Sequence, residues 1–140
     1  MLDVLDIHTH TTASGHAYNT IYEMAQSASR KGLALLGISD HGPAMEGSAS
    51  KHYFRSSELY GVKILFGCEL NIMDYDGGVD LDEIFAGTLD YGIASLHDVC
   101  ITPGSRAENT RAYLKAMENP KVHIIGHPDD GTYAVDFDEL

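Results

Sequence analysis

Histidines and one glutamate stand where apolar, strand-like runs of this sequence end. The set comprises His8, His10, His41, Glu69, His97 and His127. Imidazole nitrogens and carboxylate oxygens are the ligands that borderline divalent cations take in proteins. In an α/β barrel, the strand ends bring together catalytic groups from distant parts of the chain. The pattern therefore predicts a metal-dependent hydrolase.

His8 and His10 form the most compact part of this pattern. Two residues apart on a strand, they project from one face with backbone positions roughly 6.5 Å apart, so both rings reach one cation. Taken singly, each of the other histidines also fits an inert loop residue, and Glu69 fits a helix cap or a solvated carboxylate. Their placement at successive strand ends favours one shared site. Asp40 and Asp98 lie beside candidate ligands, and we expect them to fix imidazole tautomers or to be ordinary loop residues.

The elements that must position these residues alternate between strands and helices. Strands are predicted at 2–7, 33–38, 62–66, 89–96 and 122–125, with a turn at 75–78 that begins a small hairpin. Thr20 and Glu23 have capping-box spacing, and Gly32 suits the position after the end of the same helix. Further helices are predicted at about 51–60, closed by Gly61, at 80–87 and at 106–117, and another begins within 134–140. This alternation predicts an α/β fold with parallel strands.

One helix is predicted in more detail than the others. Within 106–117, the spacing of the less polar residues places one face toward the core, made of Ala107, Thr110, Tyr113, Leu114 and Met117.

Charge and composition exclude several classes of protein. The chain has 140 residues, 21 acidic and 9 basic, and a formal net charge of −12. No cluster of Lys or Arg interrupts this balance, so nucleic-acid binding is disfavoured. Asp3 and Asp6 interrupt any signal-peptide core and no apolar run could span a bilayer, which predicts a cytoplasmic protein without a membrane partner. Cys68 and Cys100 are expected to be free thiols, with a thiolate metal ligand as the alternative.

Several short motifs follow one another along the chain. They are His8-Thr9-His10-Thr11, Ser39-Asp40-His41-Gly42-Pro43, Gly67-Cys68-Glu69-Leu70-Asn71-Ile72 and Gly126-His127-Pro128. In this order they resemble the PHP (polymerase and histidinol phosphatase) superfamily, with the greatest similarity to its YcdX-like bacterial phosphatases. The resemblance runs from the first predicted strand to the last residue.

This resemblance implies a fold and a chemistry. The fold is a distorted (β/α)7 TIM-like barrel that holds three metal ions, usually zinc and sometimes manganese or iron. The implied ligand sets are His8 and His10 for one ion, with Glu69 bridging to a second; His97 and His127 for the second; and His16 and His41 for the third. A metal-bound water, its pKa lowered to about 7, would then attack a small phosphate monoester.

The chain also departs from the family pattern. The family completes its site with a Gly-x-Asp-x-His element, and this chain has none, so two of the nine expected ligands are missing. A complete barrel needs about 250 residues. We therefore expect residues 1–140 to be a single partial domain, truncated to about five β/α units. Its open sheet edges predict self-association, for example as a homo-oligomer.

The remaining polar residues give weaker indications. Ser14 and Arg106 are predicted to contact a substrate phosphate. His123 is expected to be a packed or partly exposed structural histidine, and His52 an exposed loop residue or part of the substrate pocket. No side chain is predicted to be catalytic beyond the metal-bound water.

The leading hypothesis is the N-terminal part of a PHP-type phosphatase, whose partner is a small phosphorylated substrate. The alternatives are a PHP-type phosphodiesterase or nuclease, an amidohydrolase-like enzyme, and an inactive fragment that binds metal without turnover.

Overall fold

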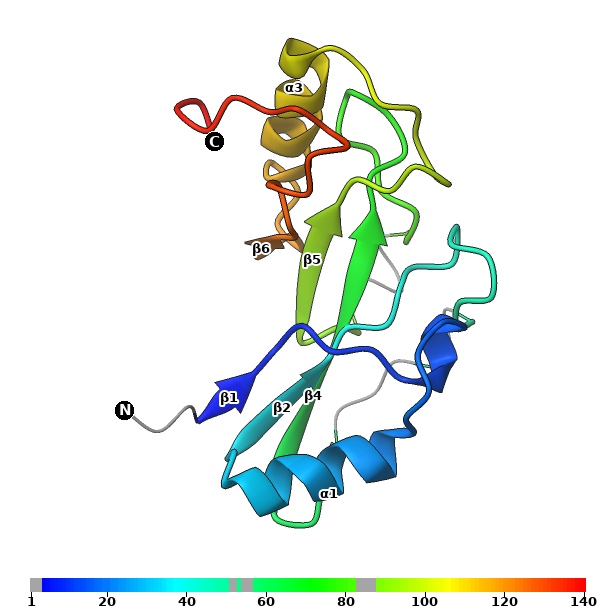
Figure 1. Ribbon diagram of the computed structural model, residues 1–140, viewed down its shortest axis with the longest axis vertical. Helices are drawn as coiled ribbons and strands as arrows, with labels where there is room; N and C mark the ends of the chain where they lie inside the picture. Colours follow the sequence, from blue (N-terminus) through cyan, green and yellow to red (C-terminus); the bar gives the residue numbers. More distant parts are fainter. Residues whose placement is uncertain (1–3, 51–52, 54–56, 83–87) are drawn as a thin grey trace.

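A parallel sheet organises the molecule. The computed structural model describes residues 4–50, 53, 57–82 and 88–140. Five parallel strands lie in the order β1 (Leu5–Asp6), β2 (Leu35–Ile38), β4 (Val62–Asn71), β5 (Tyr91–Ser95) and β6 (Ile124–Ile125), and β3 (Ser57–Leu59) pairs antiparallel with β4. The sheet curls into a half-barrel (Figure 1). This confirms the predicted α/β class and agrees with part of a TIM-like barrel, while the number of β/α units stays a prediction.

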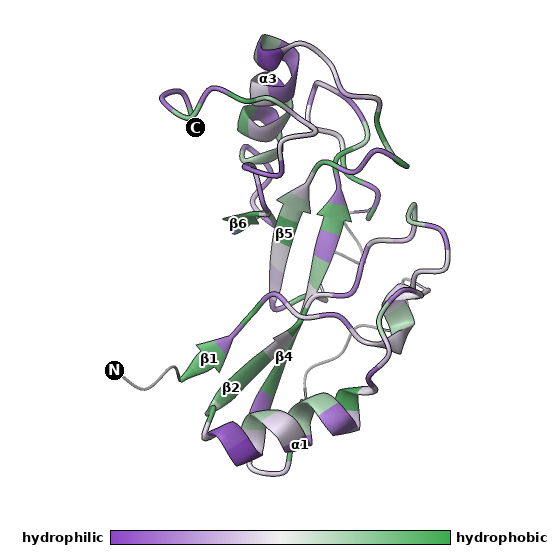
Figure 2. Ribbon diagram, in the orientation of Figure 1, coloured by the Kyte–Doolittle hydropathy of each residue, from purple (hydrophilic) through white to green (hydrophobic). Residues whose placement is uncertain are grey.

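The long strand β4 joins two halves of this sheet. Residues 63–66 of β4 pair with β2, whereas residues 67–71 pair with β5. Even-numbered side chains, from Val62 to Leu70, enter a core with α1 (Ile21–Lys31). Odd-numbered positions at the carboxyl end, Glu69 among them, therefore face the inside of the half-barrel. A second core lies between β5 and α3 (Arg106–Ala116). Figure 2 shows β2 and β4 as mainly hydrophobic, and α1 as strongly hydrophilic at its C-terminal end.

The two described α-helices begin at capping boxes. Thr20 and Glu23 exchange hydrogen bonds at the start of α1, and Gly32 ends that helix with a φ of 77°, as predicted. Ser105 and Glu108 form the same motif before α3. The predicted face of α3 is partly wrong, because Ala107 and Met117 are exposed. The residues that it buries are Asn109, Thr110, Ala112, Tyr113 and Ala116.

Two predicted helices are wrong where the structure describes them. Within the predicted helix at 51–60, Ser57–Leu59 form β3 instead. Tyr60 and Gly61 have φ values of 54° and 74° between the paired residues Leu59 and Val62, which is the geometry of a two-residue hairpin turn. The segment 134–140 forms a turn stabilised by hydrogen bonds to Asp136, rather than the start of a helix. Residues 83–87 of the helix predicted at 80–87 lie outside the described residues.

A tyrosine crosses the inner face of the sheet and holds β1. The Tyr91 hydroxyl donates a hydrogen bond to the carbonyl of Ile7, at 2.6 Å. The ring passes over Gly37 and Gly67, where an added Cβ would lie 2.4 and 2.3 Å from its atoms. Glycine at both positions is therefore needed for the ring to reach across from β5 to β1. Because Ile7 immediately precedes His8, this contact positions the start of the histidine motif.

The 3-10 helix η1 (Thr12–Ser14) follows β1 and carries the chain toward α1. Across the described part of the chain, every helix is too short or too polar to cross a bilayer.

Candidate metal centre

The carboxylate of Glu69 is the centre of the site. Its side chain is 1% exposed and lies on β4, inside the half-barrel. The hydroxyl of Ser95, on the neighbouring β5, donates a hydrogen bond to Oε1 at 2.7 Å. Imidazole nitrogens lie within 3.5 Å of the two carboxylate oxygens: His8 Nε2 at 3.3 Å, His10 Nε2 at 3.2 Å, His41 Nδ1 at 2.9 Å, His97 Nε2 at 3.5 Å and His127 Nε2 at 2.9 Å.

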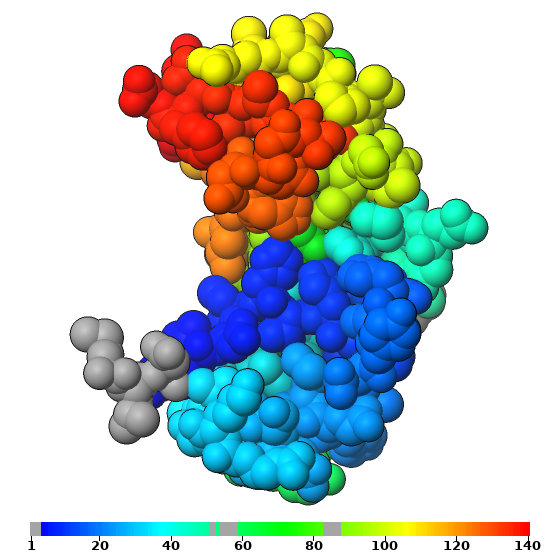
Figure 3. Space-filling view, in the orientation of Figure 1, coloured from blue at the N-terminus to red at the C-terminus, as the bar shows by residue number. Residues whose placement is uncertain are grey.

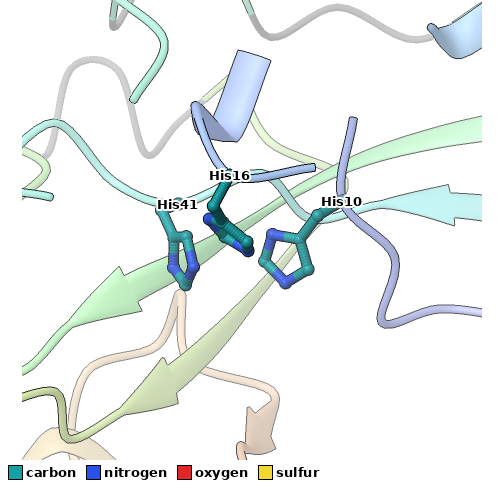
Figure 4. Close-up of side chains that lie close together, drawn as sticks. All are labelled: His10, His16 and His41. Atoms are coloured by element: carbon teal, nitrogen blue, oxygen red, sulfur yellow. The ribbon is translucent and has the colours of Figure 1, made fainter. Parts of the chain in front are cut away.

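Imidazoles form a closed ring around this carboxylate. Neighbouring ring centroids are 4.9 to 6.0 Å apart in the order His8, His10, His16, His41, His97, His127 and back to His8. Figure 4 shows three of these rings, from separate segments, turned toward one another. In Figure 3, the segments that carry His8 (blue) and His127 (orange) meet at the narrow middle of the molecule. The fold thus gathers residues that are more than 100 positions apart in the sequence.

Hydrogen bonds on the outer nitrogen orient three of the rings. The Nδ1 atom of His10 lies 2.9 Å from Oγ of Ser14, and that of His16 lies 3.1 Å from the carbonyl oxygen of Ser14. The Nδ1 atom of His97 lies 2.8 Å from Oδ1 of Asn71. Histidines that bind metal commonly engage their second nitrogen in this way, which leaves Nε2 free to bind the cation.

The electrostatics favour an ionised carboxylate at Glu69. Burial raises the pKa of Glu69, but contacts with the imidazoles, those of His10 and His127 foremost, hold the pKa well below its usual range. Burial lowers the pKa of His41, and the contact with Glu69 opposes only part of that effect. The hydrogen bond to Glu69 raises the pKa of His127 against the effect of burial. A buried, ionised carboxylate with several imidazoles beside it is a donor set that suits a divalent cation.

The residues present fit such a cation. Within the part of the chain that the structure describes, Nδ1 of His41 is buried and makes no hydrogen bond, although it lies 2.9 Å from Oε2 of Glu69. A buried nitrogen without a hydrogen-bond partner is costly unless another group occupies its lone pair. Three sets of donor atoms each lie within 4.8 Å of one another: His10, His16 and His41; His8, His10 and Glu69; His41, Glu69 and His97. Imidazole and carboxylate donors suit zinc and similar ions.

These sets agree only in part with the predicted ones. His8, His10 and Glu69 come together as predicted, and His16 lies with His41. His10 joins that last pair, however, and His41 lies with Glu69 and His97 in the third set. His127 contacts Glu69 through Oε1 alone. That these residues bind metal stays a prediction.

Ser14 is buried beside the histidines. It is 1% exposed, and its hydroxyl donates to Oδ1 of Asp40 at 2.6 Å, lies against Nδ1 of His10 and accepts from the backbone N–H of His41. These contacts support a role in orienting His10, and the contact of Ser14 with a substrate phosphate stays a prediction. Asp40 also accepts hydrogen bonds from the backbone N–H and the hydroxyl of Thr11. It is connected to His10 through the Ser14 hydroxyl and not by a direct contact with the imidazole.

Arg106 and Asp98 are not joined to the site. Arg106 is the first residue of α3 and is exposed, and Asp98 is exposed next to His97. Among the described residues, the side chain of neither makes a hydrogen bond or ion pair with the histidines, and Asp98 has the position of an ordinary loop residue, the second of the two roles expected for it. His123 lies outside the ring and contacts the backbone near Lys121, as expected of a structural histidine. His52 lies outside the described residues.

Sequence reasoning missed Asn71, Asp80 and Ser95. Asn71 is two residues after Glu69 on β4 and therefore shares its face, a signal that was available from the strand period. Ser95 occupies the corresponding face of β5, where it pairs in register with Asn71. Asp80 contacts Asn71 from the hairpin after β4, and no local pattern marks it.

The chain is similar to known proteins over nearly its whole length. The PHP domain matches residues 6–136. A probable phosphatase of Clostridium novyi is 49% identical over 142 residues, covering 98% of this chain and 58% of that protein. Probable phosphatases of Caldicellulosiruptor saccharolyticus and Acetivibrio thermocellus are 48% and 44% identical, over 94% and 98% of this chain and 57% and 59% of theirs. The chain thus spans less than two thirds of the length of these relatives, and it belongs to the PHP domain family.

Proposed function

We propose that the chain is the metal-binding part of a phosphatase that hydrolyses small phosphate monoesters. The observation that carries the proposal is the closed ring of imidazoles around the buried carboxylate of Glu69. The relatives that are named probable phosphatases agree with it. The chain spans only part of those relatives, so its phosphatase activity is proposed.

The protein groups would hold up to three divalent ions, with zinc foremost and manganese or iron as alternatives. Oε1 of Glu69 lies near His8 and His97, and Oε2 lies near His10, so the two oxygens suit two ions. His16 and His41, with His10, would hold a third. Bound ions supply Lewis acidity and lower the pKa of water. The chain itself orients the imidazoles and provides the negative charge that balances the ions.

A second candidate is metal binding without turnover. It is favoured by the 58% coverage of a relative, since groups needed for hydrolysis can lie in the remaining part. A nuclease is less well supported, because the net charge of −12 offers no stripe of positive charge for a phosphate backbone.

Metal analysis and activity on one sample test the proposal. Purified chain, loaded with zinc and freed of excess ion, should contain stoichiometric metal by mass spectrometry, and Glu69→Gln should lose most of it. The matched control is Glu118→Gln, because Glu118 is an exposed carboxylate paired with Lys115 on the surface. Hydrolysis of an aryl phosphate by metal-loaded protein supports the phosphatase. Bound metal without hydrolysis supports the second candidate, and a wild-type chain that binds no metal contradicts both.

A further inference from the structure

We propose that Asp80 fixes the tautomer of His97 through Asn71, and so presents the Nε2 lone pair of His97 to a cation. This inference rests on the metal site of the proposed function and names two residues that would tune its affinity. Neither residue is a ligand candidate, and both act through His97.

The first step concerns the orientation of the Asn71 amide. Its Nδ2 atom lies 2.7 Å from Oδ2 of Asp80 and 3.3 Å from the carbonyl oxygen of Gly42. A carboxylate and a carbonyl oxygen only accept hydrogen bonds, so the amide must turn its NH2 group toward them. Asn71 is 0% exposed, and water therefore offers no alternative partner. The Oδ1 atom of Asn71 is then the one that faces His97.

The second step follows from that orientation. Oδ1 of Asn71 lies 2.8 Å from Nδ1 of His97 and can only accept, so Nδ1 must carry the hydrogen. In a neutral ring, Nε2 then carries a lone pair. This atom lies 3.5 Å from Oε1 of Glu69, which also has only lone pairs. Two such atoms attract each other only through a cation, and the relay thereby prepares His97 for one.

The third step is the anchoring of Asp80. Its Oδ1 accepts from the backbone N–H of Asn71 at 3.0 Å, and its Oδ2 accepts from the backbone N–H of Ala44 at 2.8 Å. Its carboxylate fills the space beside Gly42, where an added Cβ would lie 2.3 Å from Oδ1. Glycine next to His41 is therefore what allows Asp80 to approach. Two backbone N–H groups and the space beside Gly42 thus hold this carboxylate in a fixed position.

Nuclear magnetic resonance reads the tautomer directly in the metal-free protein. Long-range proton–nitrogen spectra at a pH where His97 is neutral should show the Nδ1–H form in the wild type. Asn71→Leu and Asp80→Ala should shift the signal toward the Nε2–H form. Gly42→Ala tests the relay from a further position, because the three atoms nearest to its methyl group all belong to the Asp80 carboxylate, which it would displace. The control is Asp76→Asn, an exposed residue of the same hairpin that pairs with Arg111 on the surface.

Zinc affinity, measured by competition with a chromogenic chelator, completes the test. Loss of a group that orients a ligand lowers metal affinity by about 10- to 100-fold, and we expect this of Asn71→Leu and Asp80→Ala. Because Asp80 acts through Asn71, the double variant should bind no more weakly than Asn71→Leu alone. A wild-type His97 in the Nε2–H form, or relay variants that match Asp76→Asn in both measurements, would overturn the inference. Absence of zinc binding in the wild type would overturn the proposed function, while the tautomer signal still decides the relay.

Discussion

Replacing Gly67 by alanine should destabilise the protein through one side chain, Tyr91. The added Cβ would lie 2.3, 2.5 and 2.6 Å from three ring atoms of Tyr91, all far inside van der Waals contact. The ring cannot withdraw easily, because its hydroxyl is bonded to Ile7 and it is only 7% exposed. Overpacking of a core costs about 1–3 kcal/mol. Because these contacts are so short, we expect the free energy of unfolding to fall by about 3 kcal/mol.

A double-mutant cycle with urea denaturation measures this effect. The cost of Gly67→Ala should nearly vanish in a Tyr91→Ala background, which gives an interaction energy of about 3 kcal/mol between the two positions. The control is Gly32→Ala, where nothing lies within 4 Å of the added Cβ and the cost arises from the positive φ. That cost should be the same with and without Tyr91. An equal cost of Gly67→Ala in both backgrounds would refute the role of Tyr91 as the contact that requires glycine.

Three further results are expected. Hydrogen bonds from the backbone and hydroxyl of Thr20 lower the pKa of Glu23. This stabilisation of α1 is therefore present above the ordinary glutamate pKa and is lost as the pH falls through the lowered pKa. In Glu23→Gln, the melting temperature should fall less steeply as the pH is lowered. Gly126→Ala should displace the Ser95 hydroxyl, 2.0 Å from the new Cβ, and lower the melting temperature, and adding Ser95→Ala should recover part of the loss. Leu5→Lys, on the exposed strand β1, should reduce self-association in sedimentation velocity, and an unchanged sedimentation profile would contradict association through that edge.

Local chemistry made much of this fold predictable. The capping box of Thr20 and Glu23 and the αL glycine at 32 fix a helix from a few neighbouring residues, so no distant contact was needed to find it. The parallel order of the strands followed from their alternation with helices. The histidine motif at 8–10 was visible because a strand places alternate residues on one face.

The features that sequence reasoning missed depend on distant partners. Gly61 gave a correct signal for positive φ, but a helix end and a hairpin turn use the same conformation, and only pairing with β4 distinguishes them. Asp98 was considered as a partner of His97 because it is adjacent in sequence, whereas the partner in the structure, Asn71, is adjacent across the sheet. The relay through Asp80 required the hairpin geometry as well. The hairpin turn and the partner of His97 both depend on contacts between distant elements, and a local sequence pattern contains no information about such contacts.

The division of β4 between two half-sheets has a consequence for cooperativity. One hydrophobic core lies along β4 from Val62 to Leu70, another lies between β5 and α3, and among the described residues Val122 packs against both. We expect each core to form a folding unit that opens with its own free energy in hydrogen exchange. The imidazoles around Glu69 come from both units: His8 to His41 from the first, and His97 and His127 from the second. The ring is therefore complete only when both units are folded and docked, and any cation that binds it would couple their opening into one event.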